Sequence, residues 1–178
     1  TNVDQVADAL ATRAAPEDLV VVTPWYYGIT FSRYARGPWR WTTLPPIADL
    51  SVTRWDLVRA SMTVPDVVAP ISERVRATLA AGHRVWIVGN PATPRPGSER
   101  PVPPVAPHPV WGWSSDPCTD RWSQQPFHDV RAVGARIEAV PIGSEASVLE
   151  LARVFLVTSP GPADSGVTRG GRRSNHSP

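Results

Sequence analysis

Apolar residues form two short continuous runs in the chain, separated by a segment with helical spacing. Residues 19–23 and 84–88 are rich in valine and isoleucine, a pattern typical of strands that are covered on both faces. Between Pro70 and Gly82, apolar residues recur at steps of four, which predicts a helix of about three turns. Because such a crossover helix joins parallel strands, we expect the two runs to pair in parallel within one sheet.

The remaining periodicity predicts further helices and strands around this unit. Asn2 is placed to cap a first helix, with Gln5 three positions further on and able to reach back to it. Further helices are predicted over residues 28–36, over about 53–61 and from near Pro126, and further strands over 40–44, 136–141 and 153–158. The expected fold class is therefore α/β, with a small, mostly parallel sheet of four to five strands and helices on both faces.

Proline and glycine divide the chain into a domain, a loop and a tail. Eight of the nineteen residues over 91–109 are proline, so the segment 91–110 is expected to run as a long extended loop over the surface. Residues 160–178 are rich in glycine, serine and arginine, too polar to offset the entropy of ordering, and we expect a disordered tail. A single α/β domain is then expected over 1–159. Since the sequence begins at Thr1 rather than at a methionine, we expect a fragment of a longer protein.

The charge pattern excludes one class of partner. All eighteen basic residues are arginine, and they stand against sixteen acidic residues for a formal net charge of +2. Over residues 164–178 three arginines face one aspartate, which leaves residues 1–163 with fifteen basic and fifteen acidic residues. A nucleic-acid binder needs clustered cations that displace phosphate counterions, so we expect no nucleic-acid partner.

The sequence lacks the motifs of the common cofactor and metal sites. Neither G-x-G-x-x-G nor a Walker loop follows the first predicted strand, and no Gly-x-Ser-x-Gly elbow occurs. Cys118 is the only cysteine, and it shares no metal-ligand spacing with the histidines, which are His83, His108, His128 and His176. We therefore expect no cofactor and no metal. No apolar run approaches the roughly 20 residues that cross a bilayer.

Aromatic and arginine side chains gather directly after the first predicted strand. The candidate ligand-binding or docking residues are Trp25, Tyr26, Tyr27, Arg33, Tyr34, Trp39 and Trp41. Open α/β sheets bind ligands at the carboxyl ends of their parallel strands, where aromatic rings can stack on sugars and arginine can pair with phosphate. Three interpretations stay open: the rings fill the core, they dock on another domain or a membrane interface, or they bind a ligand.

A longer series of residues resembles one protein family. The series comprises residues 19–31, Arg33-Tyr34, Gly37, 41–46, 54–57 and 82–89. It resembles the soluble C-terminal region of bacterial polytopic membrane glycosyltransferases similar to the dolichyl-phosphate-mannose-protein mannosyltransferases. The resemblance covers residues 1–113 and weakens over 114–158, where the segment Asp116–Asp120 departs from the family pattern. It is absent from the tail.

The resemblance implies a role without an active site. In that family, acidic residues in an extracytoplasmic loop after the first membrane helix carry the transfer of a sugar from a polyprenyl-phosphate donor, and this loop lies outside the present sequence. The implied role is an accessory domain on the extracytoplasmic face of the bacterial membrane, not catalytic alone. The implied partners are the transmembrane part of the parent enzyme and, in addition, a glycan or lipid-linked sugar.

Two other classes of function stay open on the sequence. The first is a free-standing carbohydrate-binding or protein-interaction module that uses the aromatic and arginine residues after the first strand as its surface. The second is a small hydrolase or nucleotide enzyme, because an α/β sheet by itself does not determine function.

Overall fold

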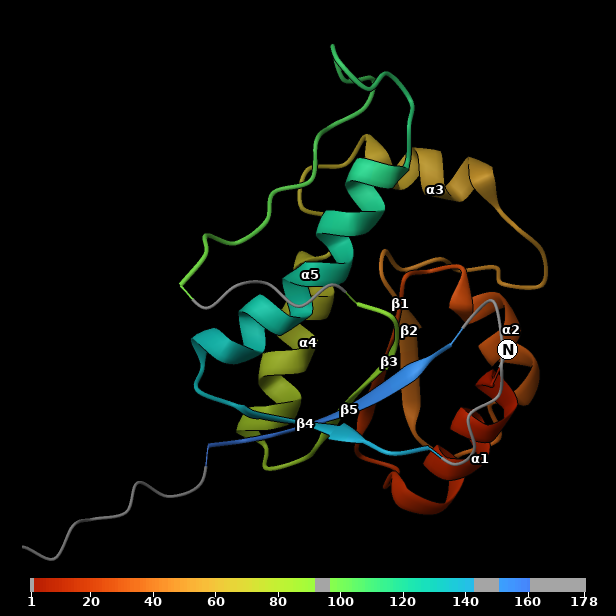
Figure 1. The fold of residues 1–178 in the computed structure, drawn as a ribbon, viewed down its shortest axis with the longest axis vertical. Coiled ribbons are helices and arrows are strands. Elements are labelled where there is room, and N and C mark those ends of the chain that lie inside the picture. The colour runs from red at the N-terminus through yellow and green to blue at the C-terminus, as the bar shows by residue number, and fades with distance from the viewer. Residues whose placement is uncertain (1, 92–96, 143–150, 161–178) are drawn as a thin grey trace, which may run out of the picture.

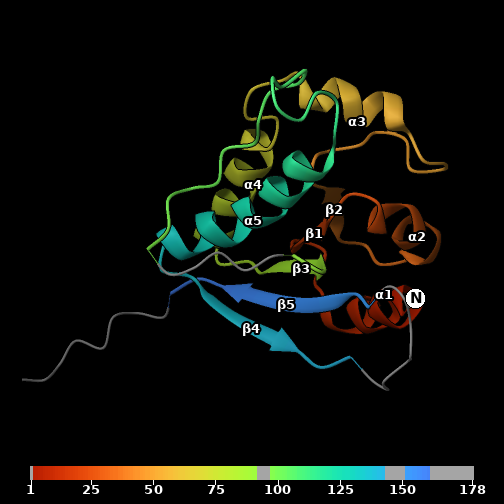
Figure 2. The ribbon, with the colours of Figure 1, turned by 45° about the horizontal axis from the view of Figure 1, so that its top comes forward.

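The computed structural model describes residues 2–91, 97–142 and 151–160, which form a sheet between two layers of helices (Figures 1 and 2). The helices are α1 (Val3–Arg13), α2 (Tyr27–Tyr34), α3 (Trp55–Met62), α4 (Ala69–Ala80) and α5 (Asp116–Ala132). The strands are β1 (Leu19–Thr23), β2 (Arg40–Thr43), β3 (Val85–Gly89), β4 (Arg136–Val140) and β5 (Arg153–Thr158). The predicted α/β fold class is confirmed.

The strands lie in the order β2-β1-β3-β5-β4. β1 pairs in parallel with both β2 and β3, so that Val21 lies opposite Thr42 on one side and Ile87 on the other. β5 runs antiparallel to β3 and to β4, so among the described strands only β5 opposes the common direction. The sheet is therefore mostly but not purely parallel, and the predicted parallel pairing of the two apolar runs is confirmed.

Alternate residues of the central strands face opposite helical layers. Val20 and Val22 pack with α1 and α2, whereas Val21 packs with α3, α4 and α5. Every residue of β1 and of β3 is buried, which explains why both strands are continuous apolar runs. Helices on both faces are thereby confirmed, and Figure 2 shows α4 and α5 on one side of the sheet and α1 on the other.

The helix predicted from near Pro126 is wrong at its start. α5 begins at Asp116 and contains Pro126 in its interior. A proline removes a helical hydrogen bond at a cost of about 3 kcal/mol, which is why it indicated a boundary. However, Cys118, Trp122 and Val130 are buried at spacings of four and eight residues, and Pro126 lies in the same stripe. Burial of this stripe on both sides of the proline stabilises the helix through it.

Asn2 does not cap α1 through its side chain, as the sequence suggested. Its amide nitrogen donates to the carbonyl of Ala152 at 3.0 Å, and its amide oxygen accepts from the Ala152 N–H at 2.8 Å. Both bonds are buried, so they tie the start of α1 to the residue that precedes β5. The other predicted elements are present, with ends that differ by at most two residues.

Parts of the predicted loop and tail lie outside the described residues. Residues 92–96 of the proline-rich segment and residues 161–178 of the expected disordered tail belong to this group. Between 97 and 115 the chain forms neither helix nor strand, apart from one isolated bridge that joins His108 and Gly112. None of the described helices has the length and apolar character needed to cross a membrane.

Candidate functional site

The carboxyl ends of β1 and β3 lie side by side where the chain turns to opposite faces of the sheet. The helix that follows β1, α2, lies on one face, and the helix that follows β3, α5, lies on the other. Open α/β sheets bind ligands outside such a point. Here the backbone closes it, because the Asn90 N–H donates to the Thr23 carbonyl at 3.2 Å and a Cβ on Gly89 would lie 1.8 Å from the Thr23 oxygen. A ligand must therefore bind further out from the strand ends.

The seven candidate residues named from the sequence do not gather on one surface. Trp25, Tyr27 and Trp39 are buried, Trp41 is partly buried, and Tyr26, Arg33 and Tyr34 are exposed. Trp25 belongs to the core under α3, α4 and α5, whereas Tyr27 and Trp39 belong to the core under α1 and α2. The sheet separates these two cores, so the cluster is divided between the two faces of the molecule.

The inner rings of this cluster join α2 to β2. Phe31 of α2 packs on Trp39 and Trp41, with ring centroids 5.7 Å and 5.1 Å apart. Gly37 permits this packing, because a Cβ at that position would lie 1.8 Å from Nε1 of Trp39. These contacts bury aromatic surface between a helix and an edge strand, so these rings are part of the hydrophobic core.

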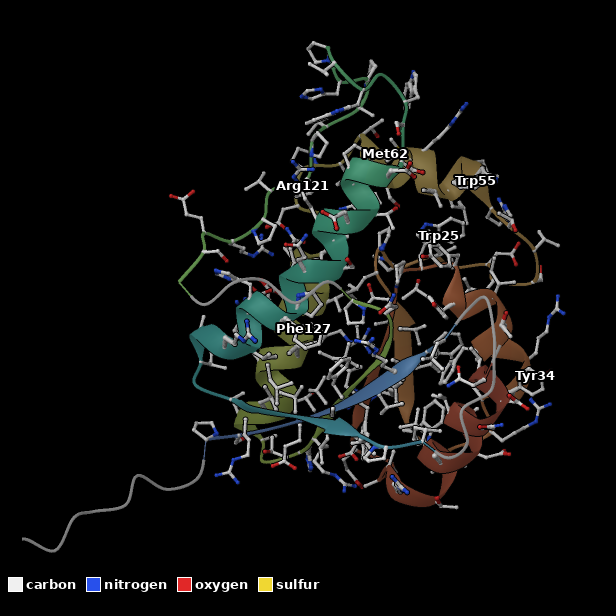
Figure 3. All side chains as sticks on the ribbon, viewed as in Figure 1. Trp25, Tyr34, Trp55, Met62, Arg121 and Phe127 are labelled. Carbon is white, nitrogen blue, oxygen red and sulfur yellow. The ribbon has the colours of Figure 1, made fainter. Side chains whose placement is uncertain are left out.

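A second set of exposed rings lies beyond the strand ends, on α3 and on the loop before α5. Trp55, the first residue of α3, is 54% exposed and packs edge-on against the buried Trp25, with ring centroids 5.3 Å apart. Trp111 and Trp113 of the loop are 40% and 46% exposed. Figure 3 shows Trp55 on α3 with Trp25 beneath it, between the helix and the sheet. These three exposed tryptophans are not among the candidate residues predicted from the sequence.

A short hairpin presents the loop tryptophans. His108 and Gly112 pair through two backbone hydrogen bonds of 2.9 Å and 2.7 Å, and Gly112 has a φ of 53°, which favours glycine. The His108 ring stacks on Trp111 with centroids 4.3 Å apart. The guanidinium carbon of Arg121, on α5, lies 5.4 Å from the centroid of the Trp111 ring. These contacts hold the hairpin against α5.

The proline-rich segment that leads into the hairpin is bound to α3 and α5. The Cys118 thiol donates to the carbonyl of Pro104 at 3.3 Å, and the Ala106 N–H donates to the carbonyl of Met62 at 2.9 Å. Burial raises the pKa of the Cys118 thiol, so the thiol stays protonated and remains a donor at neutral pH. Met62 is the last residue of α3, so the segment and this helix are fixed to each other.

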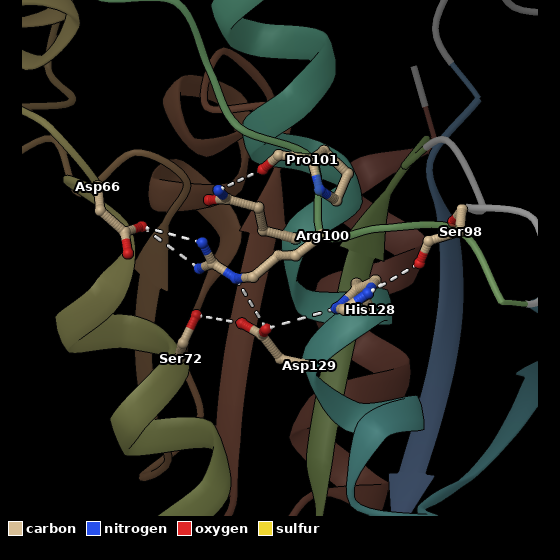
Figure 4. A network of polar contacts seen from close by, with 8 residues as sticks. Asp66, Ser72, Ser98, Arg100, Pro101, His128 and Asp129 are labelled. Carbon is tan, nitrogen blue, oxygen red and sulfur yellow. Dashed lines mark hydrogen bonds and ion pairs between the residues drawn. The ribbon is translucent and has the colours of Figure 1, made fainter.

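An ionic network fixes the start of the same segment (Figure 4). Arg100 donates from Nε to Asp129 at 3.0 Å and pairs with Asp66 at 3.3 Å, while Ser72 donates to the other carboxylate oxygen of Asp129. Partial burial by itself lowers the pKa of Arg100, but the two carboxylates outweigh it and hold that pKa above its ordinary value. The segment is thereby bound to α5 and to the turn before α4.

This network contains a serine, a histidine and an aspartate, but not in the order that a nucleophile needs. In a catalytic triad the histidine lies between the hydroxyl and the carboxylate. Here Ser72 bonds directly to Asp129, while Nε2 of His128 faces the carbonyl of Ser98 at 3.1 Å. Because Asp129 is also paired with Arg100, we assign the network to anchoring the loop rather than to catalysis.

The exposed rings and one arginine enclose a cleft between α3 and the start of α5. The cleft has a volume of about 280 Å³ and is lined by Trp55, Arg59, Met62, Trp113, Ser114 and Ser115. Arg59 lies one turn after Trp55 on α3, and its guanidinium carbon is 5.9 Å from the centroid of the Trp113 ring. Among the described residues, Arg59 has no ion pair and no hydrogen bond from its side chain. The cleft therefore combines two indole faces with an arginine whose charge is not neutralised.

Two carboxylates at this end of the molecule, those of Asp49 and Asp56, are already paired. Asp49 and Asp56 each bind Arg54 at 2.6 Å. Hydrogen bonds from Ser51, with the Arg54 contact, lower the pKa of Asp49 to about 2, and hydrogen bonds from Arg54 lower the pKa of Asp56 to about 2. Both groups are ionised at neutral pH and hold no proton to donate as a general acid.

Comparison with known proteins gave no relative that could identify the chain: no protein-family model, no curated protein and no solved structure matches it. Within the described part of the chain, no group of three or more histidine, cysteine, aspartate and glutamate side chains could hold a metal ion.

Proposed function

We propose that this chain is an accessory domain of a membrane glycosyltransferase that moves a sugar from a polyprenyl-phosphate donor, and that it is not catalytic alone. The observation that carries the proposal is the open aromatic cleft at the carboxyl end of the sheet, with Trp55, Trp113 and Arg59, which pairs with no carboxylate of the described residues. Tryptophan presents an apolar face to sugars and to the membrane interface, and arginine pairs with phosphate. The sequence resemblance over residues 1–113 supports this choice of parent enzyme class.

The proposed setting is the extracytoplasmic face of a bacterial membrane, with the transmembrane part of the parent enzyme as the partner. The domain then contributes contacts to the sugar-bearing substrate, while the transfer itself is carried by acidic residues elsewhere in the parent. The pairing of Asp49 and Asp56 with Arg54 supports this role, because neither carboxylate is available as a general acid.

The coding sequence upstream of this segment tests the proposal. We expect the reading frame to continue upstream from the codon of Thr1 into a series of apolar segments, each of about 20 residues, long enough to cross a bilayer. The complete protein should then sediment with the membrane fraction and transfer sugar from a polyprenyl-phosphate donor. A stop codon immediately before the codon of Thr1, with no apolar segments encoded in frame, contradicts the proposal.

A second candidate function is a free-standing carbohydrate-binding module. The same cleft favours it, because a half-exposed indole beside hydroxyl groups is suited to stacking on a sugar ring. The two candidates differ in the upstream reading frame. Sugar binding by a chain that is encoded without membrane segments supports the module and excludes the accessory domain.

A further inference from the structure

The cleft between α3 and the start of α5 is lined by indole rings, an arginine and serine hydroxyls. We propose that it binds a hexopyranosyl phosphate, with the sugar ring stacked on Trp113 and the phosphate paired with Arg59. The inference deepens the proposed function and rests on it for the biological source of the ligand. The site lies outside the aromatic cluster over 25–41 that the sequence indicated.

The size of the cleft suits a single sugar ring. Its volume of about 280 Å³ lies just below the range of roughly 300–1,000 Å³ that is typical of small-molecule sites. One wall comes from α3 and the other from the loop before α5, so the two indoles flank the space from separate segments. Met62, which is buried, closes the cleft between them.

The walls of the cleft are held in place before any ligand arrives. Trp55 is supported by a T-shaped contact with the buried Trp25 ring, with centroids 5.3 Å apart. The backbone bond from Ala106 to Met62 fixes the loop to α3, and the Ser114 N–H donates to the carbonyl of Trp111 at 2.9 Å. Since little ordering remains to be done on binding, the entropic cost of forming the complex is reduced.

The polar groups of the cleft match a phosphate and sugar hydroxyls. Arg59 has a fork of N–H donors that fits a phosphate, and it has no carboxylate partner among the described residues. The hydroxyls of Ser114 and Ser115 also form no hydrogen bond to the rest of the described chain, and Ser115 does not cap α5 with its side chain. These hydroxyls can therefore donate to and accept from a sugar.

The combination of groups favours a ligand with both an apolar face and a negative charge. A neutral sugar would use the indoles but form no ion pair with Arg59. Inorganic phosphate would use Arg59 but leave the two indole faces exposed. A hexopyranosyl phosphate uses both, and its ring places an apolar face and a charged group on one rigid molecule.

Calorimetric titration of the chain with glucose 1-phosphate tests the inference. We expect a dissociation constant in about the millimolar range, as befits a ligand of this size in an open cleft. Methyl α-glucoside and inorganic phosphate should each bind at least about tenfold more weakly, because each lacks one of the two interactions. If glucose 1-phosphate does not bind, or if either simpler compound binds equally well, the inference is wrong.

Variants locate the binding. Arg59→Gln and Trp113→Ala should each weaken glucose 1-phosphate binding at least about tenfold. The matched controls are Arg33→Gln and Tyr34→Ala on α2, since Arg33 is exposed and Tyr34 has the same exposed fraction, 46%, as Trp113. The controls should bind as the wild type does. Circular dichroism and the thermal midpoint establish that each variant is folded. Binding that is lost in the controls, or retained in both cleft variants, overturns the inference.

The same chemistry occurs in free sugar phosphates and in lipid-linked ones, and a second titration distinguishes the sources. Polyprenyl-phosphate-linked glucose in detergent micelles is compared with free glucose 1-phosphate, and micelles of polyprenyl phosphate without sugar serve as the control. At least about tenfold tighter binding of the lipid-linked form identifies a lipid-linked ligand. Equal or weaker binding identifies a free sugar phosphate. Absence of binding to every one of these ligands refutes the inference, but it does not test the accessory role, which the upstream coding sequence tests. An upstream stop codon contradicts the accessory role, but it does not affect the ligand binding proposed for the cleft.

Discussion

Two of the three arginines that lie over tryptophan rings in the described residues, Arg84 and Arg59, are at opposite ends of the parallel strands, and their surroundings differ. At the amino end, the guanidinium carbon of Arg84 lies 5.4 Å from the ring centroid of Trp86, and Arg84 also pairs with the buried Asp18 at 2.8 Å. At the carboxyl end, Arg59 lies 5.9 Å from the ring centroid of Trp113, with no carboxylate partner among the described residues. Arg84 therefore has a carboxylate partner in addition to its ring, whereas Arg59 has only the ring among the described residues. We call Arg84 and Trp86 the saturated pair, and Arg59 and Trp113 the open pair.

The saturated pair stabilises the fold. Asp18 accepts hydrogen bonds from Nε1 of Trp86, from the backbone N–H groups of Ala15 and Arg84, and from Nε of Arg84. Burial by itself raises the pKa of Asp18, but these hydrogen bonds outweigh it, so the pKa is lower than the ordinary 3.8. Since the segment before β1 is thereby joined to β3, this end of the sheet has a structural function. The open pair at the other end is left for a ligand.

The largest effect that we expect from this comparison is on stability at the amino end. Asp18→Asn removes the buried charge that three partners share, and it should lower the free energy of unfolding by about 3 kcal/mol. Urea denaturation measures the change. Asp8→Asn, at an exposed position of α1, is the control and should have little effect. A change below about 0.5 kcal/mol in Asp18→Asn would mean that the two ends do not differ in function.

A smaller loss of stability is expected from the arginine of the same pair. Arg84→Gln removes the ion pair with Asp18 and the hydrogen bond to the carbonyl of Arg13, and it should cost about 1.5 kcal/mol, because the side chain is partly exposed. The double variant Asp18→Asn, Arg84→Gln should lose less free energy of unfolding than the sum of the two single losses, because both substitutions remove the same ion pair. Strict additivity would contradict the pairing.

The pH dependence of stability provides a third test. The pKa of Asp18 is lowered in the folded state, so its contribution is complete above the unfolded value of 3.8 and is lost as the pH falls through the folded value. The free energy of unfolding of the wild type should therefore fall as the pH drops below about 4, and it should fall less steeply in Asp18→Asn. Chemical denaturation at a series of acidic pH values measures the slopes, and parallel slopes would contradict the assignment.

The smallest effect is expected at the open pair. Arg59→Gln should change the free energy of unfolding by no more than about 0.5 kcal/mol, because no ion pair or hydrogen bond of the described residues is lost. Urea denaturation beside Arg84→Gln gives a direct comparison of the two arginines. A loss as large as that of Arg84→Gln would show that Arg59 also stabilises the fold.

The sequence predicted the sheet better than the direction of its last strand. The runs that form β1 and β3 are apolar on both faces, and Pro70 and Gly82 mark the helix between them. Because a crossover helix joins parallel strands, the parallel pairing was predictable. The apolar run of β5 indicates a strand but carries no signal of its direction. The interior position of Pro126 was likewise not predictable from local propensity, because tertiary burial along α5 decides it.

The candidate site was less predictable than the fold. The many aromatic residues after β1 indicated a candidate site there. The sequence did not indicate that Trp25 and Trp39 lie in different cores, on opposite faces of the sheet. The cleft itself joins residues of α3 to Trp113, more than 50 positions away, and no local spacing links them. The available signals were the four-residue step from Trp55 to Arg59 on a predicted helix and the Trp-Gly-Trp sequence that ends at Trp113.

The most direct test of the account is a nuclear magnetic resonance titration of the tryptophan indole N–H signals with glucose 1-phosphate. The chain has eight tryptophans, each with one such signal. The account predicts that the signals of Trp55 and Trp113 shift as the ligand is added, while that of Trp86, bound to Asp18, stays in place. Unchanged signals for Trp55 and Trp113, or a shift confined to Trp39 and Trp41, would contradict it.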